Sequence, residues 1–139
     1  MAISDTAALL QLLEETDAFL FDCDGVIWKG NVYRWLLSLG KKVYFVTNNS
    51  TKSRKQCEKK FAMLGMDVCS EQVYTTSFAA AAYLNAKGFA SSDKKVYVLS
   101  SGTGLAEELT HFGINHVGSS EISPIVFNDA GGVVEGSFD

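Results

Sequence analysis

The stretch from Phe19 to Trp28 reads FLFDCDGVIW, an apolar run followed by two carboxylates one residue apart and then a glycine. The short run Ala18–Phe21 is typical of a parallel strand covered on both faces. Ligands of open α/β sheets bind beyond the carboxyl ends of such strands, so we expect Asp22 and Asp24 at a ligand site. Gly25 would let the backbone turn sharply there, because it has no Cβ.

Alternate residues of an extended segment point the same way, so Asp22 and Asp24 could present both carboxylates to one ligand. Two like charges so close together repel, unless a divalent cation neutralises them or they divide the roles of nucleophile and acid/base. Hard oxygen ligands of this kind favour Mg²⁺. An acidic turn after a strand is the alternative interpretation, and the motif alone leaves both open.

A second stretch, Val43–Thr51, reads VYFVTNNST and repeats this order of apolar run, polar cluster and helical pattern. Thr47 at the strand end offers a hydroxyl donor, and the backbone N–H groups after it lead into a helix N-terminus, which favours anions. Lys52 or Arg54 could reach such an anion, although charge runs usually only solvate a surface. A plain turn with a helix cap is again the alternative.

Together, Phe21–Trp28 and Phe45–Arg54 resemble the haloacid dehalogenase superfamily of phosphotransferases, in particular its phosphoglycolate phosphatase and 4-nitrophenylphosphatase branch. Ser77–Leu84 and Lys94–Val98 are similar to plant-type members, so the resemblance covers most of the chain. It implies a haloacid dehalogenase-like, Rossmann-type α/β sandwich of three layers, with a mostly parallel sheet that is incomplete at the C-terminus. The implied activity is Mg²⁺-dependent hydrolysis of a small phosphorylated metabolite, with phosphoglycolate the leading substrate.

The resemblance also implies roles for individual residues. Asp22 would be the nucleophile that forms an aspartyl-phosphate, and Asp24 the general acid/base. Mg²⁺ would be held by the Asp22 carboxylate and the Asp24 backbone carbonyl. Phosphate or substrate contacts are implied for Thr47, Asn48, Asn49 and Gly25.

The chain departs from the resembled family in two places. Relatives carry a longer segment where this chain has Asn31–Leu39. Their downstream half also supplies a lysine and a metal-binding aspartate without a recognisable counterpart here, although Asp129 could stand in for the aspartate. We therefore expect residues 1–139 to be the N-terminal part of a catalytic domain, ending near the start of a cap domain, because in the resembled family a cap domain follows a stretch like Gly131–Asp139.

Two further interpretations stay open. The chain could be a truncated, catalytically silent domain that acts as a binding or interaction fragment. A response-regulator receiver ranks third, because no separate phospho-acceptor aspartate ends a central strand.

Composition limits the class of protein. A chain of 139 residues with 47% hydrophobic content suits one domain with a real core. A net charge of −4 argues against nucleic acid or an anionic membrane as a partner. The sequence shows no apolar run long enough to span a membrane and no leader pattern. Its three cysteines form no Cys-x-x-Cys pair. We therefore expect a reducing, cytoplasmic location. An open apolar sheet edge would favour a homo-oligomer.

Periodicity predicts alternating helices and strands. The predicted helices run from Ser4 or Asp5 to Glu14, over Asn31–Leu39, over Ser53–Leu64, over Ser77–Lys87 with Ser77 as the cap, and up to Phe112. The predicted strands are Ala18–Phe21, Val43–Val46, Val73–Thr75, Val96–Leu99, Asn115–Val117 and Ile125–Phe127.

Some side chains are assigned to the core or to connections. The core-facing positions would be Leu9, Leu10, Leu12 and Leu13 of the first helix and Cys57, Phe61 and Leu64 of the third. Cys23 should pack away from the two aspartates. The turn Ser100–Gly104 lacks the spacing of a nucleotide-binding loop, so a plain strand-to-helix connection is expected there.

Overall fold

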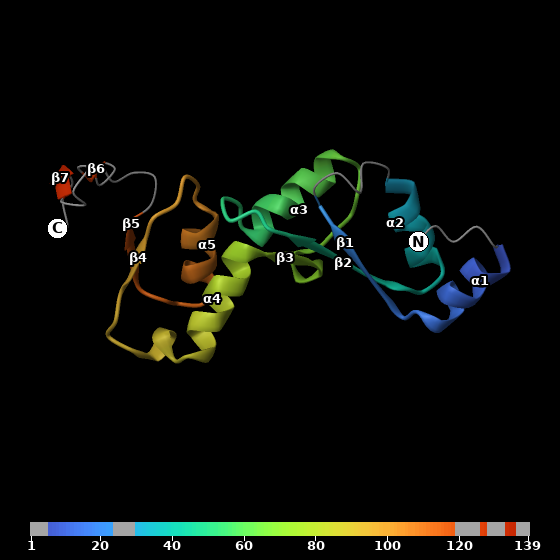
Figure 1. Ribbon diagram of the computed structural model, residues 1–139, viewed down its shortest axis with the longest axis horizontal. Helices are drawn as coiled ribbons and strands as arrows, with labels where there is room; N and C mark the ends of the chain where they lie inside the picture. Colours follow the sequence, from blue (N-terminus) through green and yellow to red (C-terminus); the bar gives the residue numbers. More distant parts are fainter. Residues whose placement is uncertain (1–5, 24–29, 119–125, 128–132, 136–139) are drawn as a thin grey trace. The chain divides into compact units, whose positions relative to one another are not determined.

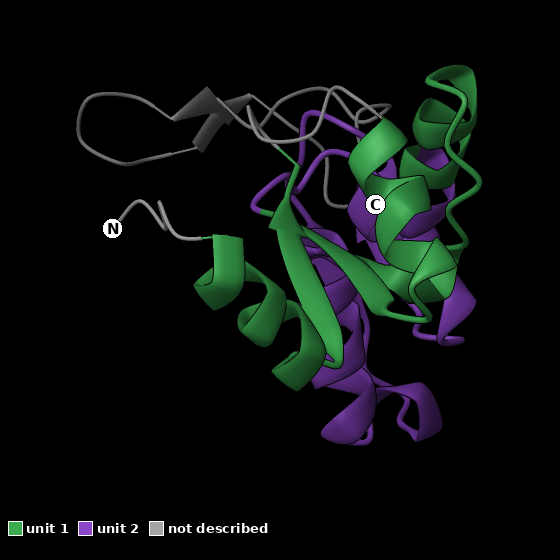
Figure 2. Ribbon diagram, turned by 90° about the vertical axis from the view of Figure 1, so that its right-hand side faces the viewer, with its two compact units in different colours: residues 1–47, 57–74 green, residues 48–56, 75–139 purple. Residues whose placement is uncertain are grey.

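The computed structural model describes residues 6–23, 30–118, 126–127 and 133–135 (Figure 1). The chain divides into two compact units, residues 1–47 with 57–74 and residues 48–56 with 75–139 (Figure 2). The chain therefore leaves the first unit after Thr47 and returns to it at Cys57. The assignment of residues 1–139 to one part of a catalytic domain stays a prediction.

The first unit is built on a three-stranded sheet with the strand order β1-β2-β3. Its elements are α1 (Thr6–Glu15), β1 (Ala18–Asp22), α2 (Gly30–Ser38), β2 (Lys42–Thr47), most of α3 (Arg54–Met63), the 3₁₀ helix η1 (Ser70–Gln72) and most of β3 (Val73–Thr75). β1 and β2 run parallel, with Ala18 opposite Lys42 and Asp22 opposite Val46. The predicted parallel pairing is confirmed for these two strands, which α2 connects.

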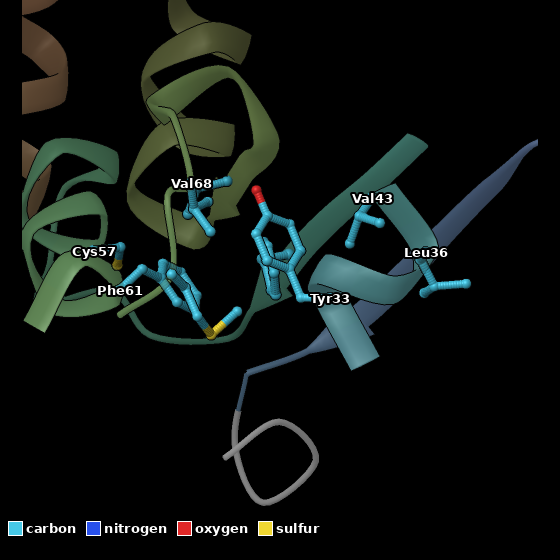
Figure 3. Packing of buried hydrophobic residues seen from close by; sticks show 9 residues of the cluster. Tyr33, Leu36, Val43, Cys57, Phe61 and Val68 are labelled. Atoms are coloured by element: carbon cyan, nitrogen blue, oxygen red, sulfur yellow. The ribbon is translucent and has the colours of Figure 1, made fainter. Parts of the chain in front are cut away.

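An aromatic cluster forms the core of the first unit (Figure 3). Phe45 of β2 is fully buried, and its ring centroid lies 4.5 Å from Phe61 of α3 and 5.7 Å from Tyr33 of α2. Such separations are favourable for tilted ring pairs. Tyr33 donates its hydroxyl hydrogen to the carbonyl of Asp67, and burial raises the pKa of this phenol above its ordinary value. The core thus sits directly beneath β2.

β1 is covered on one face only, so the prediction of burial on both faces is wrong. Phe19 and Phe21 pack against the aromatic cluster, whereas Leu20 between them is 70% exposed. Successive side chains of a strand point to opposite faces, which separates these residues. β1 ends the strand order of this sheet, and its second face carries no comparable core within the described part of the chain.

The leucines of α1 also differ from the prediction. Leu13 packs against the core cluster, but Leu9, Leu10 and Leu12 are exposed. Leu10 and Leu13 line a hollow of about 440 Å³ together with Trp35 of α2. A helix turns its residues through about 100° each, so four leucines over five positions cannot all face one sheet.

Glycines follow the ends of α2 and α3. Gly40 and Gly65 follow these helices with φ of +73° and +71°, a left-handed conformation that glycine adopts without steric cost. Leu64 was predicted to face the core but is 44% exposed, because the helix ends at Met63 and Leu64 lies in the turn.

The second unit holds two packed helices and a short parallel pair of strands. Its elements are the first turn of α3, the end of β3, α4 (Thr76–Ala86), the 3₁₀ helix η2 (Phe89–Ser91), β4 (Val96–Val98), α5 (Gly104–His111), β5 (His116–Gly118), β6 (Val126–Phe127) and β7 (Val133–Glu135). Its buried core consists of Ala81, Val98, Leu109 and Ile114. β4 and β5 pair in parallel and β6 and β7 pair antiparallel, so the described strands form three separate sheets where one was predicted.

The cap of α4 is Thr75, not Ser77 as predicted. The Thr75 hydroxyl accepts a hydrogen bond from the Phe78 N–H at 3.0 Å. The helix therefore begins at Thr76, and Ser77 lies in its first turn, where it bonds elsewhere. β7 was not predicted at all, because its glycine-rich surroundings are typical of a linker.

Candidate active site

Asp22 is the last residue of β1 and its side chain is exposed. The ladder continues for one residue beyond it, because the Cys23 N–H donates to the Val46 carbonyl at 3.1 Å. Phe21 and Cys23, on either side of Asp22, pack against the core cluster. Asp22 therefore projects on the opposite face. The prediction that Cys23 packs away from the two aspartates is confirmed for Asp22 and stays a prediction for Asp24.

Thr47 ends β2 at the same edge of the sheet. Because Asp22 lies opposite Val46 in a parallel register, Thr47 is the next residue along the neighbouring strand. Thr47 is only 5% exposed and follows Val43 and Phe45 on the buried face of β2. Asp22 and Thr47, the first polar residues of the two motifs, thus end adjoining strands, with Thr47 on the buried face of the sheet and Asp22 on the opposite face.

Three other candidate site residues cannot be placed in the same way. Asp24 and Gly25 lie outside the described residues, and so does Asp129. Their predicted roles as acid/base, phosphate contact and substitute metal ligand therefore stay predictions.

Asn49 orders the loop that follows β2. Its side-chain oxygen accepts hydrogen bonds from the Thr51 N–H and the Thr51 hydroxyl, both at 2.8 Å, and from the Lys52 N–H at 3.2 Å. Asparagine commonly mimics a backbone turn by such bonds to residues that follow it. Its neighbour Asn48 is exposed and is bound through its backbone carbonyl to the Thr76 hydroxyl.

A capping box starts α3. The Ser53 hydroxyl accepts from the Gln56 N–H, and the Gln56 side chain accepts from the Ser53 N–H, both at 3.2 Å. Reciprocal bonds of this kind satisfy two of the N–H groups that a helix leaves unpaired at its start. The alternative interpretation from the sequence was a turn and a helix cap within residues 48–51. Asn49 forms such a turn, but the cap lies further along the chain at Ser53.

The anion at the N-terminus of α3 is a side chain of the protein itself. Glu108 accepts from the Arg54 N–H at 2.6 Å, and the Arg54 guanidinium pairs with the same carboxylate at 3.1 Å. The hypothesis that Arg54 reaches a bound anion is wrong for this reason. A negative group is favourable at that position because the helix dipole is positive there. No local signal predicts this pair, since the two residues lie 54 positions apart.

The described residues contain no cluster of three or more histidine, cysteine or acidic side chains that could hold a metal ion. None of the three cysteines forms a disulfide. Within the same part of the chain, every helix is too short or too polar to cross a bilayer.

The sequence of this chain is similar to those of known hydrolases. The family described as haloacid dehalogenase-like hydrolase matches residues 19–115, from β1 to the residue before β5. Phosphoglycolate phosphatase 1A, chloroplastic, from Arabidopsis thaliana is 46% identical over 119 residues, which cover 80% of this chain and 32% of that protein. The chain thus spans about a third of the length of this relative.

Solved structures show the same fold. The p-nitrophenyl phosphatase from Archaeoglobus fulgidus aligns with a TM-score of 0.65 and 28% identity over 73% of this chain and 41% of its own. A glycerol phosphate phosphatase from Mycobacterium tuberculosis in complex with magnesium aligns with a TM-score of 0.63 and 25% identity over 76% and 33%. These alignments confirm the predicted fold class. The matched segment carries both motifs, so the chain belongs to the haloacid dehalogenase-like hydrolases.

Proposed function

We propose that this chain carries the nucleophile of a Mg²⁺-dependent phosphomonoester hydrolase, with Asp22 as that nucleophile. The observation that carries the proposal is an exposed carboxylate at the carboxyl end of β1, one residue from the level of Thr47 on the parallel neighbour. Ligands of open α/β sheets bind at this edge. The phosphatase names of the similar proteins support the same reaction class.

In the proposed reaction an Asp22 oxygen attacks the phosphorus of the substrate. A bond forms between that oxygen and phosphorus while the bond from phosphorus to the leaving oxygen breaks. Asp24 gives a proton to the leaving oxygen and then removes one from the water that hydrolyses the aspartyl-phosphate. Inorganic phosphate and the free Asp22 carboxylate result, so the enzyme is regenerated.

The chemistry of Asp22 fits Mg²⁺. This ion usually takes one or two carboxylates together with waters and the substrate phosphate, so it does not need a protein cluster of three acidic residues. We propose that the Asp22 carboxylate and the Asp24 backbone carbonyl hold it. Bound there, the ion would offset negative charge on the transferring oxygens.

The proposal extends to substrate and location. Phosphoglycolate is the leading substrate, because the Arabidopsis protein named for it is 46% identical. Thr47, Asn48, Asn49 and Gly25 are the proposed phosphate contacts. A reducing compartment such as the cytoplasm suits three cysteines that form no disulfide.

The test is Mg²⁺-dependent release of phosphate from 4-nitrophenyl phosphate and from phosphoglycolate, for the wild type and for Asp22→Asn. We expect the substitution to abolish turnover, because an amide oxygen is a far weaker nucleophile. Asp93→Asn removes the same charge from an exposed loop position and should leave turnover unchanged. Wild-type rates in Asp22→Asn would refute the assignment. No Mg²⁺-dependent release by the wild type would instead favour the catalytically silent binding fragment.

A further inference from the structure

The segment from Asn48 to Ser53, here called the 48–53 loop, is held through its backbone by two helices of its own unit. The Thr76 hydroxyl donates to the Asn48 carbonyl at 3.1 Å, and the Ser77 hydroxyl donates to the Ser50 carbonyl at 2.6 Å. From α5, the Gly104 N–H donates to the Thr51 carbonyl at 3.0 Å. Three carbonyls of the loop are thus tied down, which limits the conformations open to it.

The turn before α5 fits closely against the same loop. A Cβ at Gly102 would lie 2.5 Å from the Thr51 carbonyl oxygen, and a Cβ at Gly104 would lie 2.2 Å from the carbonyl carbon of Lys52. No other residue type could occupy these positions without moving the loop backbone. The glycines of Ser100–Gly104, which the sequence pattern assigns to a plain connection, therefore serve the fit of this turn to the 48–53 loop.

Two neighbouring glutamates of α5 complete the attachment. Glu107 accepts from the Ser53 hydroxyl at 2.5 Å, from the Gln56 amide at 2.6 Å and from the Thr103 hydroxyl at 2.8 Å. Glu108 is 3% exposed and holds both the backbone N–H and the guanidinium of Arg54.

The Arg54 guanidinium also stacks over an aromatic ring. Its carbon lies 3.8 Å from the ring centroid of Phe78 on α4. A buried carboxylate persists in a protein only when it is paired and hydrogen-bonded, and the Glu108 carboxylate is both. Arg54 is thus fixed between α4 and α5 at the point where the 48–53 loop enters α3.

We propose that Glu108 is a positioning residue, which acts through Arg54 to hold the 48–53 loop in the conformation that lets Asn48 and Asn49 contact the substrate phosphate. Glu108 does not touch the substrate in this scheme. The proposal rests on the proposed function for its purpose, but the attachment itself is a property of the fold. Glu107 supports the same loop through Ser53 and Gln56.

The first test is hydrogen exchange of the intact chain, followed peptide by peptide, for the wild type and Glu108→Gln. Removing one partner's charge from a buried pair destabilises it strongly, so amides of residues 49–54 should exchange at least about tenfold faster. Amides of β2 and of the part of α3 after Cys57 should change far less. Asp93→Asn is the matched control, since it removes one negative charge from an exposed position of the same unit. Glu107→Ala is the second variant. It carries a smaller risk to folding, because Glu107 is exposed.

The second test is the affinity of the same variants for inorganic phosphate with Mg²⁺ present, together with the KM and kcat for 4-nitrophenyl phosphate. A displaced loop should raise KM and weaken phosphate binding by about tenfold or more, with a smaller effect on kcat. Unchanged loop exchange in both glutamate variants would overturn the proposal. So would a uniform acceleration over the whole chain, which indicates a role in global stability alone. A third outcome separates the two proposals. If the wild type binds no phosphate but Glu108→Gln still speeds exchange in the loop alone, the proposed function is refuted and the attachment of the loop is established.

Discussion

Gly104→Ala is the substitution whose effect the structure sets most clearly. The new Cβ would lie 2.2 Å from the Lys52 carbonyl carbon and 2.6 Å from its Cα, both backbone atoms that no rotamer change can remove. Relief to ordinary contact near 3.5 Å needs a shift of roughly 1.3 Å between α5 and the 48–53 loop. Overpacking of this kind costs about 1–3 kcal/mol, and the hydrogen bond from the Gly104 N–H to Thr51 adds about 1 kcal/mol when it is lost.

A gain in helix propensity of up to about 1 kcal/mol offsets part of this cost. We therefore expect the free energy of unfolding to fall by about 2 kcal/mol, and the midpoint of thermal unfolding to fall by about 7 °C. Urea unfolding followed by circular dichroism measures the first quantity, and a thermal scan measures the second. Amides of residues 49–54 should also exchange faster than in the wild type.

Gly113→Ala is the matched control at the other end of α5. Gly113 has a φ of +68°, but no atom lies within 4 Å of the position that a Cβ would take there, so alanine meets only the conformational cost of about 1 kcal/mol. It should leave the exchange of the 48–53 loop unchanged. A loss at Gly104 no larger than the loss at Gly113 would refute the close fit of the turn to the loop.

Three other expectations concern chemistry and assembly. Asp24→Asn should still allow Asp22 to be phosphorylated by 4-nitrophenyl phosphate, because the phenolate leaves without a proton; the absence of any phosphate label on the protein would contradict this. The 139 residues tested alone should turn over several orders of magnitude more slowly than typical enzymes, near or below about 0.01 s⁻¹ in a stopped assay, because the resemblance implies a downstream lysine with no recognisable counterpart in them, and loss of such a cation costs that much. Leu20→Thr should reduce self-association measured by light scattering, because Leu20 is 70% exposed on β1; an unchanged mass at every concentration would count against that surface.

Local sequence signals predict much of this fold. The apolar runs before Asp22 and Thr47 predict β1 and β2, and the placement of both polar residues at the carboxyl edge follows from the parallel register. Gly40 and Gly65 mark helix ends because a left-handed φ is a property of single residues. Each of these signals depends on a few neighbouring residues, so it can be recognised from the sequence alone.

Only the tertiary structure shows which side chains meet across long separations. Arg54 and Glu108 are 54 positions apart. Charge patterning predicted that Arg54 is solvated or binds an anion, but the packing of α5 supplies Glu108 as its partner. The exposure of Leu20 likewise depends on which elements cover β1, and an apolar run cannot encode that. Periodicity determined the elements and the ends of the strands that carry the candidate site. The contacts that shape the 48–53 loop were decided by packing, because the energy of a buried pair depends on surroundings that distant parts of the chain provide.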